Sequence, residues 1–379
     1  MPKKQKIHII SFQVPYPADY GGAIDVYYKA KALKKHGYEI TLHTFAYDGR
    51  GYNEALHDIA DEVLLYKRHT GLCGLLSTLP YIVKSRQSDE LLKNLLKDNA
   101  PILFEGTHTT HLLSSPLLKG RKRFVRAHNI ESDYYRLLAT ASVSIFKKIF
   151  FLLESYKLKR YEPKLKYADI LFAITEKDKE ILEKKCPQTK VELLPCFHSG
   201  EFDRMNTAEL GHGNYVLYNG NLAVEENIKA ALYLIKEVTP LTRDTKWIIA
   251  GKSPSELIIK EASRRDNVEI VANPTNEEMT RLVSQATANV LITFQSTGIK
   301  LKLLNTLCNG GHCIANNKMI EGSRLEVLCI MADNAQEIAT AINDVKIKRI
   351  GKEDIEKRKL VLRELYDNDK NILTLTKHL

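Results

Sequence analysis

The feature that most constrains the fold is an alternation of short β-branched runs with longer helical stretches. Such an alternation is typical of a mainly parallel sheet that helices cover on both faces. It occurs as two series, separated by a polar segment at 196–214 without clear periodicity. We therefore expect an α/β fold with two similar halves. The runs expected to form strands are 7–12, 39–45, 101–106, 123–128, 168–175 and 191–195 in the first series, and 214–220, 245–251, 267–271, 288–294 and 312–316 in the second.

This division predicts three parts of the chain. We expect a first domain at 1–200, a second at 201–352, and a helical tail at 353–379 that packs back on the first domain. A length of 379 residues suits two domains better than one core. Since α/β proteins bind ligands at the carboxyl ends of their strands, we expect the binding site in a cleft between the domains. The longer helices are expected at 23–37, 131–160, 223–238, 254–265, 276–286 and 299–309.

Cysteine usage and hydropathy favour a cytoplasmic protein. The six cysteines form no CxxC pair and no zinc-ligand spacing, which is typical of reduced thiols. The first apolar run is short and is broken by Gln13, which predicts a strand rather than a signal peptide. No window reaches the roughly 18 apolar residues that a membrane-spanning helix needs.

The positive charge is concentrated in one segment. The net charge is +10, and residues 119–166 alone hold 13 basic and 4 acidic residues. The second part of this segment mixes aromatic and aliphatic residues with lysines at helical spacing, which suits an anionic membrane surface on the inner face of the membrane. The alternative is a solvated helix face over an ordinary core. No nucleic-acid recognition motif accompanies the charge, so nucleic acid is not an expected partner.

The stretch 288–311 predicts an anion site in the second domain. Its apolar strand, 288–294, is followed by small polar residues and Gly298. Gly298 would let the backbone approach a ligand closely. The amides from Ile299 to Leu301 would then be the unpaired N–H groups of a helix start, where anions bind.

Two lysines accompany this helix start. Helical spacing would separate Lys300 and Lys302 by about 200°, so we expect that only one of them faces a ligand. Lys302 and Asn305 share a helix face, and we predict that Lys302 points into the cleft. The alternative is that both lysines merely extend to solvent from an amphipathic helix.

Two other strand ends in the second domain carry glycines. Gly220 and Asn221 open the turn before helix 223–238, where a backbone amide could meet phosphate oxygens. Gly251 and Lys252 follow the next strand and could line the cleft. An ordinary turn between strand and helix is the alternative for both pairs, and it is the favoured one for Gly251 and Lys252.

A glycine pair links the first strand to the first helix. Gly21 and Gly22 precede helix 23–37, and Asp19 and Asp25 are polar candidates beside them. The pair would allow close approach to a ligand, although a tight turn alone could require it.

Further candidates follow two adjacent strands of the first domain. Arg126, His128 and Glu131 lie where strand 123–128 meets a long helix, and Glu105 and His108 follow the preceding strand. A histidine near its neutral pKa could hydrogen-bond a ligand hydroxyl, or it could be a satisfied structural histidine. The THTTH spacing is not a metal motif.

The order of these motifs resembles that of a known enzyme family. From the glycine pair at 21–22 through RAHNIES at 126–132 to GIKLKLLN at 298–305, the chain resembles GT-B glycosyltransferases of family 4, the retaining group 1 type. The resemblance implies two Rossmann-like domains that face each other across a cleft. It also implies metal-independent transfer, with retention, from a UDP- or GDP-linked sugar to a glycan or lipid-linked acceptor, without a further cofactor.

The chain departs from this family at its central motif. The family places glutamates eight positions apart, on the donor sugar and on the ribose, and these positions fall on Thr297 and Asn305. The lysine three residues before the second position is kept as Lys302. An arginine that often follows the first glycine loop is replaced by Asn221, so Lys302 and helix amides would carry the diphosphate.

The resemblance assigns roles to the candidates. His128 and Lys302 are expected to be catalytic. The expected donor-binding residues are Gly21, Gly22, Gly220, Asn221, Gly251, Lys252, Thr297, Gly298, Ile299, Lys300, Leu301 and Asn305, and the expected acceptor-side residues are Asp19, Glu105, His108, Arg126 and Glu131.

Three functions remain open at this point. The first is a hexosyltransferase-like glycosyltransferase of glycan biosynthesis. The second is a non-catalytic nucleotide-sugar-binding subunit of a membrane-associated glycan assembly, which the missing carboxylates favour. The third is an epimerase on the same fold, which the absence of clearly paired acid and base carboxylates disfavours.

Overall fold

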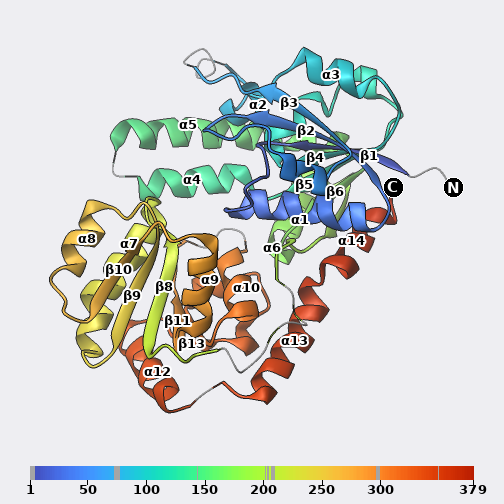
Figure 1. Ribbon diagram of the computed structural model, residues 1–379. Coiled ribbons are helices and arrows are strands. Elements are labelled where there is room, and N and C mark those ends of the chain that lie inside the picture. The colour runs from blue at the N-terminus through green and yellow to red at the C-terminus, as the bar shows by residue number, and fades with distance from the viewer. Residues whose placement is uncertain are drawn as a thin grey trace. The chain divides into compact units, whose positions relative to one another are not determined.

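The computed structural model describes residues 5–71, 77–142, 144–200, 202, 205, 210–295, 299–348 and 350–379. The chain divides into two compact units (Figure 1). Unit 1 consists of Met1–His198 together with Tyr366–Leu379, and unit 2 consists of Ser199–Leu365. The chain therefore leaves unit 1, forms unit 2 and then returns to unit 1.

Unit 1 is built on a seven-stranded sheet in which all neighbouring strands are parallel. The strand order is β3-β2-β1-β4-β5-β6-β7, so the direction of winding reverses between β1 and β4. The carboxyl ends of strands at such a reversal form a crevice that suits ligands. The strands are β1 (Lys6–Ser11), β2 (Glu39–Ala46), β3 (Glu62–Lys67), β4 (Ile102–Glu105), β5 (Arg123–Ala127), β6 (Ile170–Ala173) and β7 (Lys190–Leu193).

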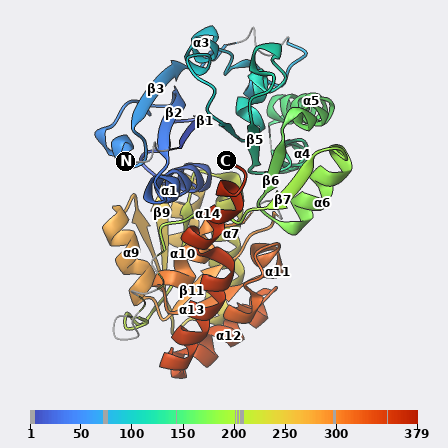
Figure 2. The ribbon, with the colours of Figure 1, turned by 90° about the vertical axis from the view of Figure 1, so that its right-hand side faces the viewer.

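Helices cover both faces of this sheet, and each face has its own apolar cluster. On one face Ile9 and Leu42 pack with Ile372 and Leu375 of the carboxyl-terminal segment. Figure 2 shows this segment as α14 beside α1. The helices are α1 (Gly21–Lys35), α2 (Tyr81–Lys84), α3 (Asp89–Leu95), α4 (Glu131–Ala141), α5 (Ile145–Tyr161), α6 (Glu176–Lys185) and α14 (Asn368–Thr376).

Unit 2 has a six-stranded parallel sheet in the order β10-β9-β8-β11-β12-β13. Its winding reverses between β8 and β11, and its core contains the buried Trp247. The strands are β8 (Tyr215–Asn221), β9 (Lys246–Lys252), β10 (Val268–Ala272), β11 (Ala288–Leu291), β12 (His312–Ala315) and β13 (Ile330–Met331). The helices are α7 (Glu225–Tyr233), α8 (Glu256–Ala262), α9 (Asn276–Gln285), α10 (Leu301–Asn309), α11 (Asn317–Ile320), α12 (Ala335–Ile347) and α13 (Lys352–Tyr366).

Several elements differ from those expected from the sequence. The helix expected at 131–160 is two helices, because Ser142 is extended and the Ser144 hydroxyl caps a new helix at the Lys147 amide. The tail is also two helices, and Asp367 caps the second one. The strand β3 was not expected. No described helix is long and apolar enough to cross a membrane.

Candidate functional site

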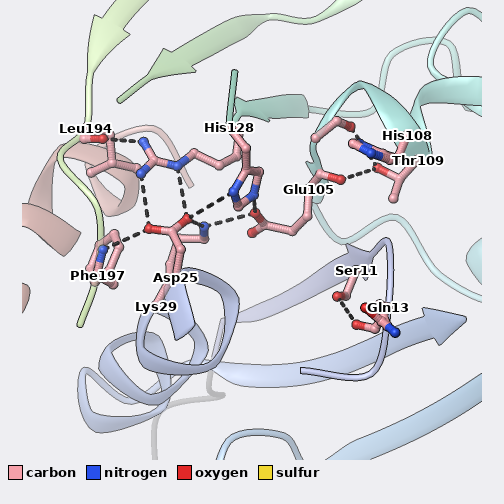
Figure 3. A network of polar contacts seen from close by, with 12 residues as sticks. Ser11, Gln13, Asp25, Lys29, Glu105, His108, Thr109, His128, Leu194 and Phe197 are labelled. Atoms are coloured by element: carbon pink, nitrogen blue, oxygen red, sulfur yellow. Dashed lines mark hydrogen bonds and ion pairs between the residues drawn. The ribbon is translucent and has the colours of Figure 1, made fainter. Parts of the chain in front are cut away.

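The strand ends of unit 1 hold a buried ionic cluster, which comprises Asp25, Lys29, Glu105, Arg126 and His128 (Figure 3). Asp25 and Lys29 lie one turn apart on α1, and the other three side chains come from the ends of β4 and β5. The first four side chains are almost completely buried, whereas His128 is 9% exposed. His128 is therefore the member of the cluster that a ligand could reach first.

Asp25 is the centre of the ionic cluster. Its carboxylate accepts hydrogen bonds from Lys29 Nζ at 2.9 Å and from the Arg126 guanidinium at 3.1 and 3.2 Å. The Phe197 amide donates a further bond at 2.8 Å. Burial alone would raise the pKa of Asp25, but the Arg126 and Lys29 charges outweigh burial and hold that pKa well below its usual range. Asp25 is thus an anion that fixes two cations.

Glu105 connects the ionic cluster to His128. Its Oε2 accepts from Lys29 Nζ and from His128 Nε2, each at 2.9 Å. Among the described residues, Glu105 Oε1 has no hydrogen-bond partner. Because Nε2 donates to Glu105, Nδ1 of a neutral His128 is left as the acceptor, 3.9 Å from Asp25 Oδ2. The cluster therefore fixes the orientation of the imidazole.

The same residues raise the question of a metal. Ligand atoms of Asp25, Glu105 and His128 lie within 4.8 Å of one another. However, Lys29 Nζ already lies between the two carboxylates, and Arg126 binds both oxygens of Asp25. These cations neutralise the carboxylates, so the donor set does not fit a metal ion.

His108 and Glu131 lie near the ionic cluster. Gly106 adopts a φ of +69°, and the turn after it brings the His108 ring within 5.0 Å of Phe12, measured between ring centroids. Burial and the Arg86 charge hold the pKa of His108 well below its usual value, so the ring is neutral. Burial, assisted by the Glu162 charge, raises the pKa of Glu131 to about 8. Glu131 is therefore mostly protonated at neutral pH.

The glycine pair predicted to approach a ligand lies at the start of α1. Gly21 is the first residue of α1, and a Cβ on Gly22 would lie 2.6 Å from Phe12 Cζ. A side chain at position 22 would therefore have to displace the ring of Phe12, the residue that follows β1. Asp19 is paired with Arg50 at the surface.

In unit 2, the Lys302 side chain lies over β8. Its Nζ is 4.9 Å from the centroid of the buried Tyr218 ring and 3.4 Å from Asn227 Oδ1. Within the described residues no carboxylate forms an ion pair with Lys302. Burial lowers the pKa of Lys302 to about 8, although the Glu226 charge opposes this shift. Among the residues that the structure describes, Lys302 is therefore a cation without a directly bound counter-ion.

The position of Lys300 contradicts the prediction that Lys300 and Lys302 face in different directions. Its Nζ pairs with Glu226 Oε1 at 3.0 Å, one residue before the Asn227 that contacts Lys302. The physical reason is that α10 begins at Leu301, and Lys300 precedes it in an extended conformation. Helical spacing does not apply between them, so both lysines reach the start of α7.

The strand-end glycines of unit 2 are close-packed. A Cβ on Gly251 would lie 1.8 Å from the Gly220 carbonyl oxygen, and a Cβ on Gly220 would lie 3.0 Å from Asn227 Cγ. Asn221 accepts from the Asn227 side chain through its carbonyl group. Lys252 is exposed, and its carbonyl accepts from the Leu222 amide. The close approach of the β8 backbone therefore explains Gly251 without a ligand, whereas the neighbour of Gly220 is a side chain, that of Asn227.

The remaining candidates lie at α10. Ile299 and Leu301 are half-buried on either side of Lys300. Asn305 accepts from the Asn309 side chain at 2.9 Å. Thr297 and Gly298 lie outside the described residues.

The sequence analysis did not identify Lys29 as a member of the ionic cluster, nor Tyr218 and Asn227 as neighbours of Lys302. Lys29 reads as one of several lysines on an amphipathic helix, and its spacing of four residues from Asp25 is the only local signal. Tyr218 and Asn227 have no local signal, because their role depends on how β8 and α7 pack against Lys302.

Comparison with known proteins adds to this geometry. No protein-family model matches the chain. An "Uncharacterized 44.6 kDa protein in cps region" of Klebsiella pneumoniae is 25% identical in an alignment of 342 residues that covers 84% of each chain.

Solved structures resemble nearly the whole chain. Sucrose-phosphate synthase from Thermosynechococcus elongatus superposes with a TM-score of 0.69 at 15% identity, covering 99% of this chain and 98% of its own. "Trehalose-6-phosphate from E. coli bound with UDP-2-fluoro glucose" gives 0.65 at 11% identity, covering 98% of both chains. The UDP-forming α,α-trehalose-phosphate synthase of Burkholderia xenovorans, in complex with glucose-6-phosphate, gives 0.64 at 12%, covering 98% and 99%. These likenesses confirm the predicted two-domain α/β fold of GT-B type.

Proposed function

We propose that this chain is a glycosyltransferase of the family 4 type. It would move a sugar from a UDP- or GDP-linked donor to a glycan or lipid-linked glycan acceptor, in the cytoplasm and without a metal. The observation that carries this proposal is Lys302, a half-buried ammonium near the strand reversal of unit 2 that has no bound counter-ion in the described part of the chain. Holding an unpaired cation there has a cost in desolvation, which a bound diphosphate would offset.

The chemistry follows from where charge develops. When the bond between the sugar and the diphosphate breaks, negative charge grows on the leaving diphosphate. A fixed ammonium stabilises that charge more than it stabilises the intact donor, and this difference accelerates the reaction. The acceptor hydroxyl would attack from the face that the diphosphate leaves, with a phosphate oxygen as base, so the configuration at the anomeric carbon would be retained.

His128 would act on the sugar or on the acceptor. Its imidazole is oriented by Glu105, and Glu105 is itself held by Lys29. An imidazole in a fixed orientation can hydrogen-bond a hydroxyl without rearranging. The ionic cluster would therefore position His128 rather than take part in the reaction.

The ligands and the gene region given in the descriptions of similar proteins support this proposal. One structural neighbour is described with UDP-2-fluoro glucose bound and another with glucose-6-phosphate. The Klebsiella pneumoniae protein is described as lying in a cps region, which favours a polysaccharide as the product.

A nucleotide-sugar-binding subunit without transferase activity is the second candidate. It is favoured by Asn305, which stands where the family places a glutamate and whose side chain already accepts from Asn309. A ribose hydroxyl would have to compete with this bond.

One experiment separates the two candidates. UDP, GDP and their hexose conjugates are titrated calorimetrically, and release of the nucleotide from the best ligand is then followed with glycan and lipid-linked acceptors. The proposed transferase should bind one nucleotide class and release it only with an acceptor, and Lys302→Ala should abolish that release while the protein remains folded. Tight binding without turnover would support the binding subunit, and turnover by Lys302→Ala near the wild-type rate would contradict the proposal.

A further inference from the structure

The helix α5 of unit 1 presents apolar side chains to solvent. The exposed fraction of these side chains lies between 48% and 83%, with Phe146 the most exposed. Monomeric proteins rarely leave such a continuous apolar surface open without a partner. We call this surface the α5 face, and its apolar members are Ile145, Phe146, Ile149, Leu152, Leu153 and Tyr156.

Helical geometry places these side chains on one side of α5. At about 100° per residue, Leu152, Ile145, Tyr156 and Ile149 lie within an arc of roughly 60°. The opposite side of α5 is the one that packs into unit 1, through buried Leu158 and Tyr161. The α5 face is therefore a second apolar surface, which the fold of unit 1 does not use.

The exposed charges on α5 all have the same sign. Its cations Lys147, Lys148, Lys159 and Arg160 are exposed. Its one carboxylate, Glu154, is 1% exposed and accepts from the Tyr81 amide and from Lys157. Every exposed charged side chain on α5 is consequently positive.

The next carboxylate along the chain is also turned inward. Glu162 is 2% exposed and is bonded to the Ser132 amide and hydroxyl and to Lys185. The two carboxylates of residues 145–162 are thus both consumed by internal contacts. The apolar side chains and the cations beside them, Lys148, Lys159 and Arg160, form one outward surface.

We propose that the α5 face docks the protein on an anionic lipid surface. Helices that lie in the plane of a membrane combine an apolar side that enters the acyl boundary with Lys and Arg that meet anionic headgroups. The α5 face has both properties. A second copy of the chain is a poorer partner, because pairing two such faces would bring like charges together. This inference does not depend on transferase activity, although docking would bring unit 1 to a lipid-linked acceptor.

Vesicle binding tests the proposal directly. The full-length protein is sedimented with phosphatidylcholine vesicles and with vesicles that contain 30% phosphatidylglycerol. We expect binding to the anionic vesicles, weak binding to the neutral ones, and release as salt is raised. Lys148→Gln/Lys159→Gln/Arg160→Gln should weaken anionic binding by about 100-fold, because each cation near the surface contributes to it. Ile149→Ser/Leu152→Ser should weaken it by at least about tenfold.

Matched variants separate the α5 face from the general surface. Leu96→Ser/Leu117→Ser removes exposed apolar residues outside α5, and Lys93→Gln/Lys97→Gln/Lys184→Gln removes three exposed cations elsewhere on unit 1. Both controls should bind as the wild type does, and all variants should keep its urea midpoint. Equal binding by the α5 variants and the controls would overturn the proposal. So would a stable dimer that forms through the α5 face while vesicles go unbound.

Discussion

The two charged sites of this molecule treat their cations in opposite ways. In unit 1, Lys29 and Arg126 contact the carboxylates of Asp25 and Glu105 directly. In unit 2, Lys302 contacts an amide oxygen and an aromatic ring. Buried charges are tolerated when they are paired, so the first arrangement is self-sufficient, whereas the second would gain from an added anion. We infer from this difference that unit 1 contributes side chains that are held rigidly, and that unit 2 contributes the group that binds an anion.

The largest expected effect breaks the paired site. Asp25→Ala leaves two cations buried without their shared partner, and we expect the free energy of unfolding of unit 1 to fall by about 3–5 kcal/mol. The lone tryptophan, Trp247, lies in unit 2, so circular dichroism should detect an early transition that tryptophan fluorescence does not. Asp19→Ala, which removes the surface pair with Arg50, should cost less than about 1 kcal/mol. Similar losses in both variants would contradict the role given to the ionic cluster.

The next prediction removes the unpaired cation. Lys302→Ala should weaken nucleoside diphosphate binding by about 100-fold, which is the order expected when one partner of a desolvated charge pair is lost. Lys302→Met should weaken binding similarly and raise the melting temperature seen by Trp247 fluorescence, because a half-buried charge is replaced by an apolar chain. Lys260→Ala, at an exposed lysine of α8 in the same unit, is the control and should change neither value. A Lys302→Met protein that melts earlier would show that the ammonium stabilises the fold.

A smaller effect concerns the scaffold beneath Lys302. Gly251→Ala places a Cβ against the Gly220 carbonyl, so β8 and β9 must separate, and we expect a loss of roughly 1–3 kcal/mol in the stability of unit 2. Trp247 fluorescence in urea measures it. Gly351→Ala, in the same unit, would bring its Cβ no closer than 3.6 Å to Asp354 Oδ2 and should be close to neutral. A neutral Gly251→Ala would mean that the close approach of the two strands is not required.

The mildest test is a change of pH. Lys302 loses its positive charge as the pH rises through about 8. A bound diphosphate favours the charged form, so affinity should fall by about tenfold between pH 7 and pH 9. Calorimetric titration at several pH values measures this, and Lys302→Met should flatten the profile. A wild-type profile as flat as that of the variant would assign the anion to another group.

The sequence was sufficient for features that depend on local pattern. The alternation of strands and helices predicted both sheets, and the strand, glycine and helix around 288–311 drew attention to Lys302 from the residues alone. Contacts between residues that lie far apart in the sequence could not be predicted. Asp25 and Arg126 are 101 positions apart, and no single sequence shows that they touch. The prediction that Lys300 and Lys302 face in different directions was wrong because it placed both of them in one helix. The helix α10 begins at Leu301, so Lys300 lies just before it.

The return of the chain to unit 1 has a consequence for synthesis. Ile372 and Leu375 belong to an apolar cluster that also contains Ile7 and Ile9, so that cluster stays incomplete until residues 366–379 have left the ribosome. Unit 2, made in between, has all of its strands before then. The half that begins first would therefore be the half that finishes folding last, and a nascent chain stalled near residue 365 would expose a partly open core to chaperones.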